Sequence, residues 1–301
     1  MIQFQRVTPA LRDTIAPLLM ASGRRGAEYS FANLCMWGRQ ECAVEDGVLL
    51  LFSHYDGRSM YPFPVGQGDL HSALERIMAD SRKRGIPCRL AGLTPADRQE
   101  LERLYPGKFR FHISRDSFDY LYRIEDLATL KGKKLQQKRN HMNRFESAHP
   151  DACLRPLEGD VREEAKAFVD YWFTCRLQQD PTGDYQLEQT ALRRAFRCFD
   201  HLGLEGLALY VDGQVIAITM GSFINEQVFD VHFEKGDPQL PESYAAINRG
   251  FARHLMEKYP TVQFLNREDD MGLPGLRKAK LSYNPVELVE KCWAVLAAED
   301  E

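Results

Sequence analysis

The chain contains two stretches in which hydrophobic and polar residues follow the same order. Each stretch has apolar segments on both sides of an Asp-Gly pair, at 46–47 in "AVEDGVLLLF" and at 212–213 in "LYVDGQVIAITM". Such a pair between apolar segments indicates a tight hairpin, because the turn needs positive φ at both central positions. A second turn signal follows each hairpin, at 56–57 and at 225–226. Each stretch therefore predicts an antiparallel meander of three strands.

Apolar residues at helical spacing predict a helix before and a helix after each meander. The stripes before the meanders are Leu11, Ile15 and Leu18 in the first stretch, and Val161, Ala165, Phe168 and Trp172 in the second. The stripes after the meanders are Leu70, Leu74, Ile77 and Met78, and Tyr244, Ile247, Phe251 and Leu255. Each later helix leads into a short apolar strand, at 87–93 or 261–266, then a further helix and a last strand, "SFDYLYRI" or "VELVEKCWAV".

The repeated order predicts an α+β fold built twice, with one copy in residues 1–128 and the other in residues 129–301. Meander, helix, strand, helix and strand is the element order of the GNAT acyltransferase fold. We therefore predict a tandem GNAT fold, in which mixed and mainly antiparallel sheets are flanked by helices. The alternative is that hairpin and helix signals recur by chance in an α+β protein. Only the second copy continues into a strongly charged motif, so a single active site is expected there.

The composition is that of a soluble globular protein, with 44% apolar, 27% charged and 11% aromatic residues among 301. No basic cap with an apolar run opens the chain, and the longest aliphatic run, "GVLLLF", is too short to cross a bilayer. The seven cysteines are scattered without a C-x-x-C pair, and the eight histidines show no metal-binding spacing. We expect a cytoplasmic protein with reduced thiols, no transmembrane segment and no metal site.

Residues 266–285, "NREDDMGLPGLRKAKLSYNP", combine acidic and basic residues with two glycines and two prolines. The first part follows a strand and precedes a helix, and such loops commonly present functional side chains. In the helix, Arg277 and Lys280 lie three positions apart and share one edge. Two cations near a helix start can hold a phosphate or a carboxylate. The alternative is a surface on which the acids pair with neighbouring bases, where each pair contributes little.

The charged motif resembles the signature of an uncharacterised bacterial family related to the C-terminal domain of phosphatidylglycerol lysyltransferase, in the form "N-R-E-D-D-x-G-x-x-G-L-R-K-A-K-L-S-Y-x-P". The similarity extends to "AEYSFANLCMW" (27–37), to "KKLQQKRNHMNRFE" (133–146) and to "HFEKGD", and so covers nearly the whole chain. The resemblance implies a tandem GNAT fold similar to that of the Fem aminoacyltransferases, which move an amino acid from aminoacyl-tRNA to an amine or hydroxyl acceptor. It is most specific at Leu276, Arg277, Lys278, Lys280, Tyr283 and Pro285.

Acyl transfer from an ester needs a base, a group that stabilises the oxyanion and an acid for the leaving group. Alternation along "VFDVHFEKGD" places Asp230, His232 and Glu234 on one strand face. The catalytic candidates are Glu234 as the base, Lys280 and Arg277 for the oxyanion or a phosphate, and Tyr283 for the leaving oxygen. The candidates for substrate binding are His232, which is also the second choice of base, Tyr244, Asn248, Asn266, Arg267, Glu268 and Asp270. A salt-bridged strand face and a packed tyrosine are the alternatives.

Residues 131–144, "KGKKLQQKRNHMNR", hold six Lys or Arg and no acid, in a chain with a formal charge of −4. Helical spacing places Leu135, Met142 and Phe145 in an apolar seam beside the cations. Such a face is a sequence-independent phosphate footprint of the kind that a tRNA acceptor stem needs. The candidate contacts are Lys134, Lys138, Arg139, His141 and Arg144. The alternative is a solvated connector between the two copies.

The residues after the central strand of the second copy do not favour a CoA donor. CoA-dependent GNAT enzymes carry a Q/R-x-x-G-x-G/A motif there, whose N–H groups hold pyrophosphate, whereas "EKGDPQLPES" has one glycine and two prolines, which lack a donor. The leading hypothesis is an aminoacyl- or acyl-transferase that uses aminoacyl-tRNA or another phosphorylated donor. The alternatives are a non-catalytic module that binds RNA or another anion, and a CoA-dependent N-acetyltransferase. The acceptor and the oligomeric state are left open.

Overall fold

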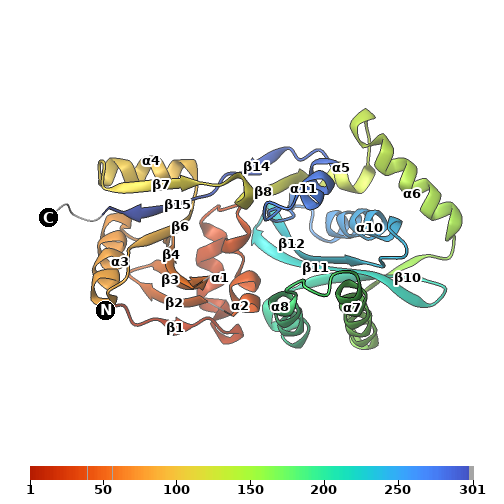
Figure 1. The fold of residues 1–301 in the computed structure, drawn as a ribbon, viewed down its shortest axis with the longest axis horizontal. Helices are drawn as coiled ribbons and strands as arrows, with labels where there is room; N and C mark the ends of the chain where they lie inside the picture. The colour runs from red at the N-terminus through yellow and green to blue at the C-terminus, as the bar shows by residue number, and fades with distance from the viewer. Residues whose placement is uncertain (39, 56, 298–301) are drawn as a thin grey trace.

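Two mixed β-sheets, each flanked by helices, form the two halves of the molecule (Figure 1). The structure is a computed structural model that describes residues 1–38, 40–55 and 57–297. The first sheet lies at the left of Figure 1 and the second sheet at the right. The α+β fold with mixed sheets that the repeated pattern predicts is confirmed.

Each sheet combines strands from distant parts of the chain. In order across the sheet, the first contains β1 (Gln5–Arg6), β2 (Gln40–Glu45), β3 (Val48–Tyr55), β4 (Arg58–Pro62), β6 (Arg89–Leu93), β15 (Cys292–Leu296) and β7 (Phe109–Ile113), with β5 (Val65–Gly66) beside β3. The second contains β14 (Glu287–Val289), β8 (Asp119–Arg123), β13 (Phe264–Asn266), β12 (Val228–Gly236), β11 (Gln214–Asn225), β10 (Glu205–Val211) and β9 (Cys153–Pro156).

The helices fall between these strands along the chain. The first half contains α1 (Arg12–Ala21), α2 (Phe31–Trp37), α3 (Leu70–Arg84) and α4 (Pro95–Leu104). The remaining α-helices are α5 (Ile124–Thr129), α6 (Gln136–Ala148), α7 (Gly159–Gln179), α8 (Gln186–Arg197), α9 (Phe199–Leu202), α10 (Glu242–Lys258) and α11 (Pro274–Leu281). Short 3-10 turns lie at Pro9–Leu11, Ala27–Tyr29, Arg115–Ser117 and Lys133–Leu135.

Both predicted hairpins form at their Asp-Gly pairs. Asp46 and Gly47 have φ of 50° and 76°, and Asp212 and Gly213 have φ of 49° and 74°, as a type I′ turn requires. β2, β3 and β4 make the first meander, and β10, β11 and β12 make the second. The second turn of the later meander lies at 225–228, as predicted, whereas the corresponding turn at 56–57 includes a residue outside the described part of the chain.

The last strand of each half pairs in the sheet of the other half, which the repeated pattern does not predict. β8 lies between β13 and β14 and is antiparallel to both, and β15 lies in the same way between β6 and β7. β8 can occupy a central position because Tyr120, Leu121 and Tyr122 are all buried. Apolar character predicts that such a strand is central, but it carries no information about which sheet receives it.

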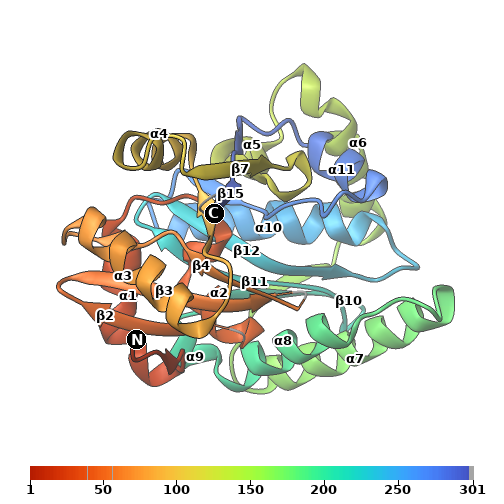
Figure 2. The same ribbon diagram turned by 60° about the vertical axis from the view of Figure 1, so that its left-hand side comes forward.

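Helices cover both faces of the second sheet. Figure 2 shows α10 on one face, and α7 and α8 on the other. Along β11, Ile218 and Met220 belong to the core cluster of α7 and α8, while Ala217 belongs to the cluster of α10. The first of these clusters also contains Leu34 and Met36 of α2, so the two halves share a hydrophobic core. The halves are therefore joined by packing as well as by exchanged strands.

Strands β12 and β13 are paired over only part of their length. Their parallel register ends at Asp230 and Asn266, after which β12 continues to Gly236 while the other chain segment enters the loop at 267–273. We call the region where these segments diverge, residues 231–236 and 267–270, the wedge. In the first sheet, β4 and β6 also pair at only two positions, Tyr61 with Leu90 and Pro62 with Ala91. The wedge brings the predicted strand face and the charged motif together.

Candidate functional site

A buried ion pair crosses the wedge. Arg267 Nη2 lies 2.7 Å from Glu234 Oε1, and Asn248 Nδ2 of α10 donates to Glu234 Oε2 at 3.0 Å. The Arg267 and Glu234 side chains are only 13% and 11% exposed. Burial alone would lower the pKa of Arg267, but Glu234, together with Tyr122 and Tyr283, outweighs burial and raises it. Arg267 is therefore held charged in a poorly hydrated place.

Two cations and one aromatic ring complete this side of the wedge. The Tyr283 ring is buried, with Arg267 Cζ 5.0 Å and Lys138 Nζ 4.1 Å from its centroid. Burial raises the pKa of Tyr283 to about 12, so its hydroxyl stays protonated at neutral pH. Burial and the nearby Arg267 lower the pKa of Lys138. The basic segment of the sequence thus contributes Lys138 to the aromatic ring that also contacts Arg267.

Two buried polar atoms beside Glu234 lack a hydrogen-bond partner in the described part of the chain. They are Arg267 Nη1, a donor, and Asn248 Oδ1, an acceptor. A buried donor or acceptor without a partner costs about 1–3 kcal/mol. The pair is therefore suited to a ligand that offers an acceptor and a donor close together.

Tyr244 lies one turn before Asn248 on α10. Its hydroxyl accepts a hydrogen bond from Trp172 Nε1 at 3.1 Å, and burial raises its pKa. Lys235 Nζ lies 3.9 Å from the centroid of the Trp172 ring and 2.7 Å from Glu188. These contacts connect α7 and α8 to the end of β12. Trp172 was predicted only as a core residue, and nothing in the sequence indicates its hydrogen bond.

A second polar cluster lies on the same strand face as Glu234. His232 Nδ1 is 3.2 Å from Asp230 Oδ2 and 3.5 Å from Glu268 Oε1, and its Nε2 is 2.8 Å from Ser222 Oγ. Ser222 Oγ in turn lies 2.9 Å from Ser30 Oγ, which caps α2. The register of the β11–β12 hairpin places Ser222 opposite Asp230. Bulges shift this register, so counting residues from the turn does not predict the pairing.

Lys280 is occupied by backbone contacts. Its ammonium donates to the three backbone oxygens of residues 267–269, at 2.5 and 3.1 Å for the first two. An anion at Lys280 would have to displace these carbonyls, so the contacts do not support the predicted phosphate or oxyanion role. Lys280 instead fixes the loop that carries Arg267 and Glu268. Its role in catalysis stays a prediction without a structural basis.

Arg277 likewise holds the loop in place. It binds both oxygens of Asp270 at 2.8 Å and one oxygen of Asp116 at 2.6 Å. Asp270 also accepts from Tyr120 at 2.5 Å, and the bonds from Arg277 hold its pKa below the ordinary value. The alternative of acid–base pairing within the motif therefore describes Arg277 and Asp270, whereas Arg267 pairs with Glu234 outside it.

Asn266 joins the two halves. Its Nδ2 donates to the backbone oxygen of Arg25 at 2.7 Å and to Asp119 at 2.9 Å, and its Oδ1 accepts from the N–H of Glu268 at 2.6 Å. Both polar ends of the side chain are thus used by the protein. The predicted role of Asn266 in substrate binding has no free group to support it.

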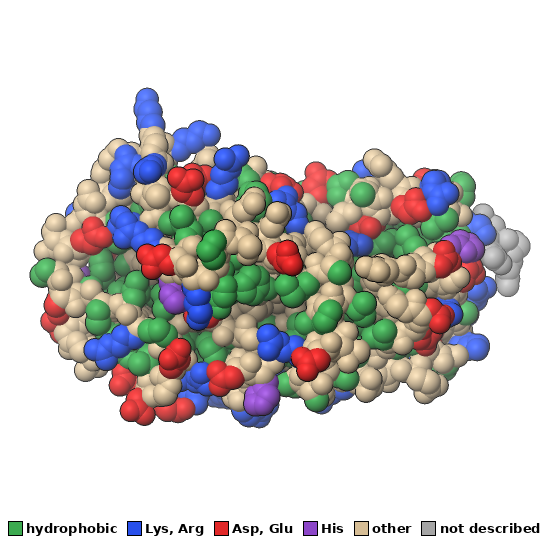
Figure 3. Space-filling view, turned by 180° about the vertical axis from the view of Figure 1, so that it is seen from behind, with side chains coloured by type: hydrophobic (Ala, Val, Ile, Leu, Met, Phe, Trp, Pro, Cys, Tyr) green, Lys and Arg blue, Asp and Glu red, His purple; other side chains and the backbone are tan. Residues whose placement is uncertain are grey.

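The remaining cations of the basic segment do not enter the wedge. Leu135, Met142 and Phe145 are buried, which confirms the apolar seam of α6. Arg139 donates to the backbone oxygens of residues 130 and 132 and so fixes the connector. Lys134 and Arg144 are exposed, and His141 is half-buried. Figure 3 shows Lys and Arg side chains at the end of the molecule that α6 occupies.

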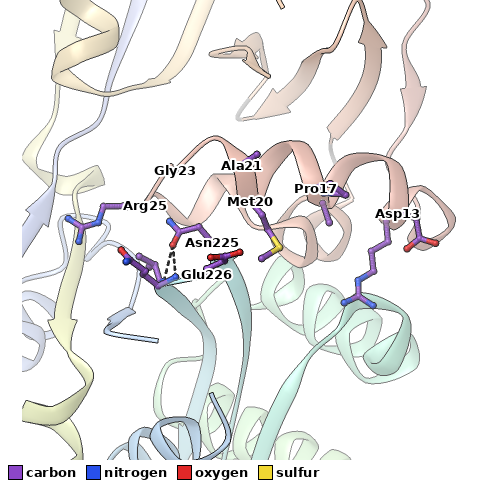
Figure 4. A pocket seen from close by; sticks show the side chains of 12 residues that line it. Asp13, Pro17, Met20, Ala21, Gly23, Arg25, Asn225 and Glu226 are labelled. Atoms are coloured by element: carbon purple, nitrogen blue, oxygen red, sulfur yellow. Dashed lines mark hydrogen bonds between the residues drawn. The ribbon is translucent and has the colours of Figure 1, made fainter. Parts of the chain in front are cut away.

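Two of the cavities among the described residues have linings that do not include Glu234. One of about 890 Å³ lies between α1 and the β11–β12 turn, where Asn225 Oδ1 accepts two backbone N–H bonds (Figure 4). Another, of about 470 Å³, lies where β4 and β6 separate and is lined by Met60, Leu90 and Trp293 among others. Neither cavity is lined by a predicted site residue.

Comparisons with known proteins place the chain in a family. A family model described as "Phosphatidylglycerol lysyltransferase, C-terminal" matches residues 20–295. A conserved protein of unknown function from Bacteroides thetaiotaomicron VPI-5482 is 40% identical, with a TM-score of 0.94 over 99% of this chain and 100% of that one. The chain spans about half the length of a curated relative, an uncharacterized protein of Mycoplasmoides gallisepticum that is 28% identical over 181 residues, 60% of this chain and 56% of the relative.

More distant solved structures share the fold. L-PGS from Bacillus licheniformis has a TM-score of 0.70 at 13% identity, over 100% of this chain and 95% of that one. FemX has a TM-score of 0.62 at 11% identity, over 98% of both chains. Within the described residues, none of the helices has the length and apolar character needed to cross a bilayer. The family model covers most of the sequence, and the chain therefore belongs to the family of the phosphatidylglycerol lysyltransferase C-terminal domain.

Proposed function

We propose that the protein is an aminoacyltransferase that binds the aminoacyl ester of a charged tRNA in the wedge, beside Glu234 and Arg267. One observation carries the proposal: the buried Glu234–Arg267 pair is flanked by one unpartnered donor, Arg267 Nη1, and one unpartnered acceptor, Asn248 Oδ1, among the described residues. An α-amino ester presents a carbonyl oxygen and an ammonium group two atoms apart. The ester carbonyl can accept from Arg267 Nη1, and the ammonium can donate to Asn248 Oδ1 and to the carboxylate of Glu234.

The same residues suit the transfer step. The attacking amine or hydroxyl forms a bond to the ester carbonyl carbon and gives its proton to Glu234, while negative charge develops on the oxygen beside Arg267. The bond to the ribose oxygen then breaks, and that oxygen receives a proton, for which the Tyr283 hydroxyl is the candidate acid. Lys280, Arg277 and Asn266 act indirectly in this scheme, because they position the loop that carries Arg267.

The surface of α6 favours a polynucleotide as the donor carrier. Lys138 contacts the Tyr283 ring while Lys134 and Arg144 are exposed on the same segment. Exposed cations on the segment that carries Lys138 suit the phosphates of an acceptor stem, whose binding is driven by counterion release. A charged tRNA as donor also implies a reaction in the cytoplasm.

The loop after β12 argues against CoA as the donor. The N–H groups of Asp237, Gln239, Leu240 and Ser243 are already bonded to Ile216, Asp237 and Leu240 within the protein, and Pro238 and Pro241 have none. A pyrophosphate group therefore finds few free backbone donors before α10.

A single-turnover experiment tests the proposal. Purified protein is mixed with tRNA charged with radiolabelled amino acids, and label that leaves the tRNA for an amine or lipid acceptor is counted. We expect Glu234→Gln to slow transfer about 100-fold, as loss of a general base does, while the control Lys166→Met, in an exposed pair with Glu163, leaves the rate unchanged. Tight tRNA binding without transfer to any acceptor would support the non-catalytic alternative instead.

A further inference from the structure

Three side chains from two separate segments converge beside the wedge. Asp230 and His232 lie on β12, and Glu268 lies in the loop after β13, yet one ligand atom from each lies within 4.8 Å of the other two. Sequence spacing cannot indicate this cluster, because 36 positions separate His232 from Glu268. The expectation of no metal site rests on spacing alone.

The two distances from His232 match the edges of a metal coordination shell. His232 Nδ1 lies 3.2 Å from Asp230 Oδ2 and 3.5 Å from Glu268 Oε1. Two ligands at about 2.1 Å from a tetrahedral Zn²⁺ ion lie about 3.4 Å from each other. An ion beside His232 Nδ1 can therefore contact either carboxylate, and the third edge, between Asp230 and Glu268, lies within 4.8 Å.

The hydrogen bonds of His232 orient its other nitrogen toward the carboxylates. His232 Nε2–H can donate to Ser222 Oγ at 2.8 Å, and the Ser222 hydroxyl can then donate to Ser30 Oγ at 2.9 Å. Each of the two donors then has an acceptor. In this arrangement Nδ1 carries the lone pair that a metal requires. A bond from the distal nitrogen is also what fixes most metal-binding histidines.

The cluster contains polar atoms that the protein leaves unpartnered. Both oxygens of Asp230, which is 0% exposed, and Nδ1 of His232 have no hydrogen-bond partner within the described residues. A lone pair facing two carboxylates at these distances is repulsive unless a metal ion or a proton lies between them. The nearest ammonium groups are engaged elsewhere: Lys280 with backbone oxygens, and Lys291 with Asp119.

We infer that Asp230, His232 and Glu268 bind a divalent metal ion, for which Zn²⁺ is the best match. One imidazole and two carboxylates are ordinary zinc ligands, whereas Ca²⁺ needs six or more oxygen ligands. The Glu268 side chain is 27% exposed, so this ligand is accessible to solvent. Glu268 also has φ of 56°, so its backbone is held in a conformation that is unfavourable for a non-glycine residue.

Metal binding can be measured independently of the proposed function. Full-length protein is stripped of metal with a chelator, and Zn²⁺ binding is followed by calorimetry and elemental analysis. Co²⁺ is added in parallel for its absorption spectrum. We expect one equivalent of Zn²⁺, tetrahedral cobalt bands, and at least about 10-fold weaker binding in Asp230→Asn and Glu268→Gln.

Two variants keep the experiment decisive. Glu75→Gln removes a carboxylate that lies 4.0 Å from His71 on the surface, and it should leave the affinity unchanged. Glu268→Gln lies in a loop and is the variant to rely on if Asp230→Asn does not fold. The inference is overturned if the unmodified protein takes up no stoichiometric metal, in which case a proton on His232 balances the carboxylates. It is also overturned if Glu268→Gln binds Zn²⁺ as tightly as the unmodified protein.

Discussion

Lys291 Nζ lies 2.7 Å from Asp119 Oδ1, and this ion pair links the two points at which the exchanged strands pass from one sheet to the other. Asp119 begins β8, and Lys291 directly precedes β15. The same ammonium lies 2.7 Å from Glu28. Burial alone would lower the pKa of Lys291, but Asp119 and Glu28 outweigh burial and raise it. The pair therefore fixes the crossing that brings the two halves together.

Replacing Lys291 should destabilise the whole protein. Lys291→Met leaves Asp119, whose side chain is 1% exposed, without its cation, and we expect a loss of about 3 kcal/mol in the free energy of unfolding. Urea denaturation measures this loss. The control Lys166→Met breaks the exposed pair with Glu163 and should cost under about 1 kcal/mol. Equal costs for the two variants would contradict a structural role for the buried pair.

Lys280 should prove to be a structural residue. Lys280→Met removes three charge-assisted bonds to the loop at 267–269, so we expect a loss of about 2–3 kcal/mol and a lower melting temperature. Lys278→Met is the matched control, because Lys278 is exposed on the same helix. The sequence-based hypothesis of an anion receptor predicts the opposite for Lys280→Met, namely weaker ligand binding at an unchanged melting temperature.

The cluster around Glu205 should give the protein a pH-dependent stability. Burial alone would raise the pKa of Glu205, but bonds from His254, Lys258 and Tyr259 lower it to about 2, from 4.5 in the unfolded chain. The folded pKa is depressed, so the contribution is fully present above pH 4.5 and is lost as pH falls through 2. We expect Glu205→Gln to cost about 3 kcal/mol at pH 7.

Chemical denaturation of both proteins at several pH values measures this effect. The difference between Glu205→Gln and the unmodified protein should shrink as the pH falls from 4.5 toward 2. A difference that stays constant over this range would show that the carboxylate charge is not what stabilises the cluster.

The exposed cations of α6 and the turn before it should control the salt dependence of tRNA binding. Lys134→Ala and Arg144→Ala should each reduce the slope of log affinity against log salt by about 1, without a change in melting temperature. Filter binding at several salt concentrations measures the slope. Lys166→Ala on α7 is the control and should leave it unchanged. If Lys134→Ala and Arg144→Ala keep the slope of the unmodified protein, as Lys166→Ala should, α6 is only a connector.

The local elements could be predicted because their signals are local. The Asp-Gly turns at 46–47 and 212–213 and the apolar stripes of α3 and α10 each determine a short segment through its own backbone preferences. The exchange of β8 and β15 depends instead on pairing between residues that are more than 100 positions apart. A buried strand such as residues 120–122 fits any central position, so its sequence does not choose between the sheets.

The residues of the site could be predicted from local patterns, but their contacts could not. Alternation along β12 placed Glu234 and His232 on one face, and the charged motif contained Arg267, so the residues of the wedge could be named. Their partners could not. The contacts of Lys280 depend on the course of a loop with positive φ at residues 268 and 271, and Lys138 reaches the ring of residue 283 from a helix more than 140 positions away.

The binding preference for charged over uncharged tRNA tests the central claim most directly, because it isolates recognition of the aminoacyl group. The affinities of a non-hydrolysable aminoacyl-tRNA and of the same tRNA without its amino acid are measured for the unmodified protein and for Arg267→Lys. We expect the unmodified protein to prefer the charged form at least about 10-fold, equivalent to about 1.4 kcal/mol, and Arg267→Lys to lose that preference while it still binds uncharged tRNA. Equal affinity of the unmodified protein for both forms would contradict the account.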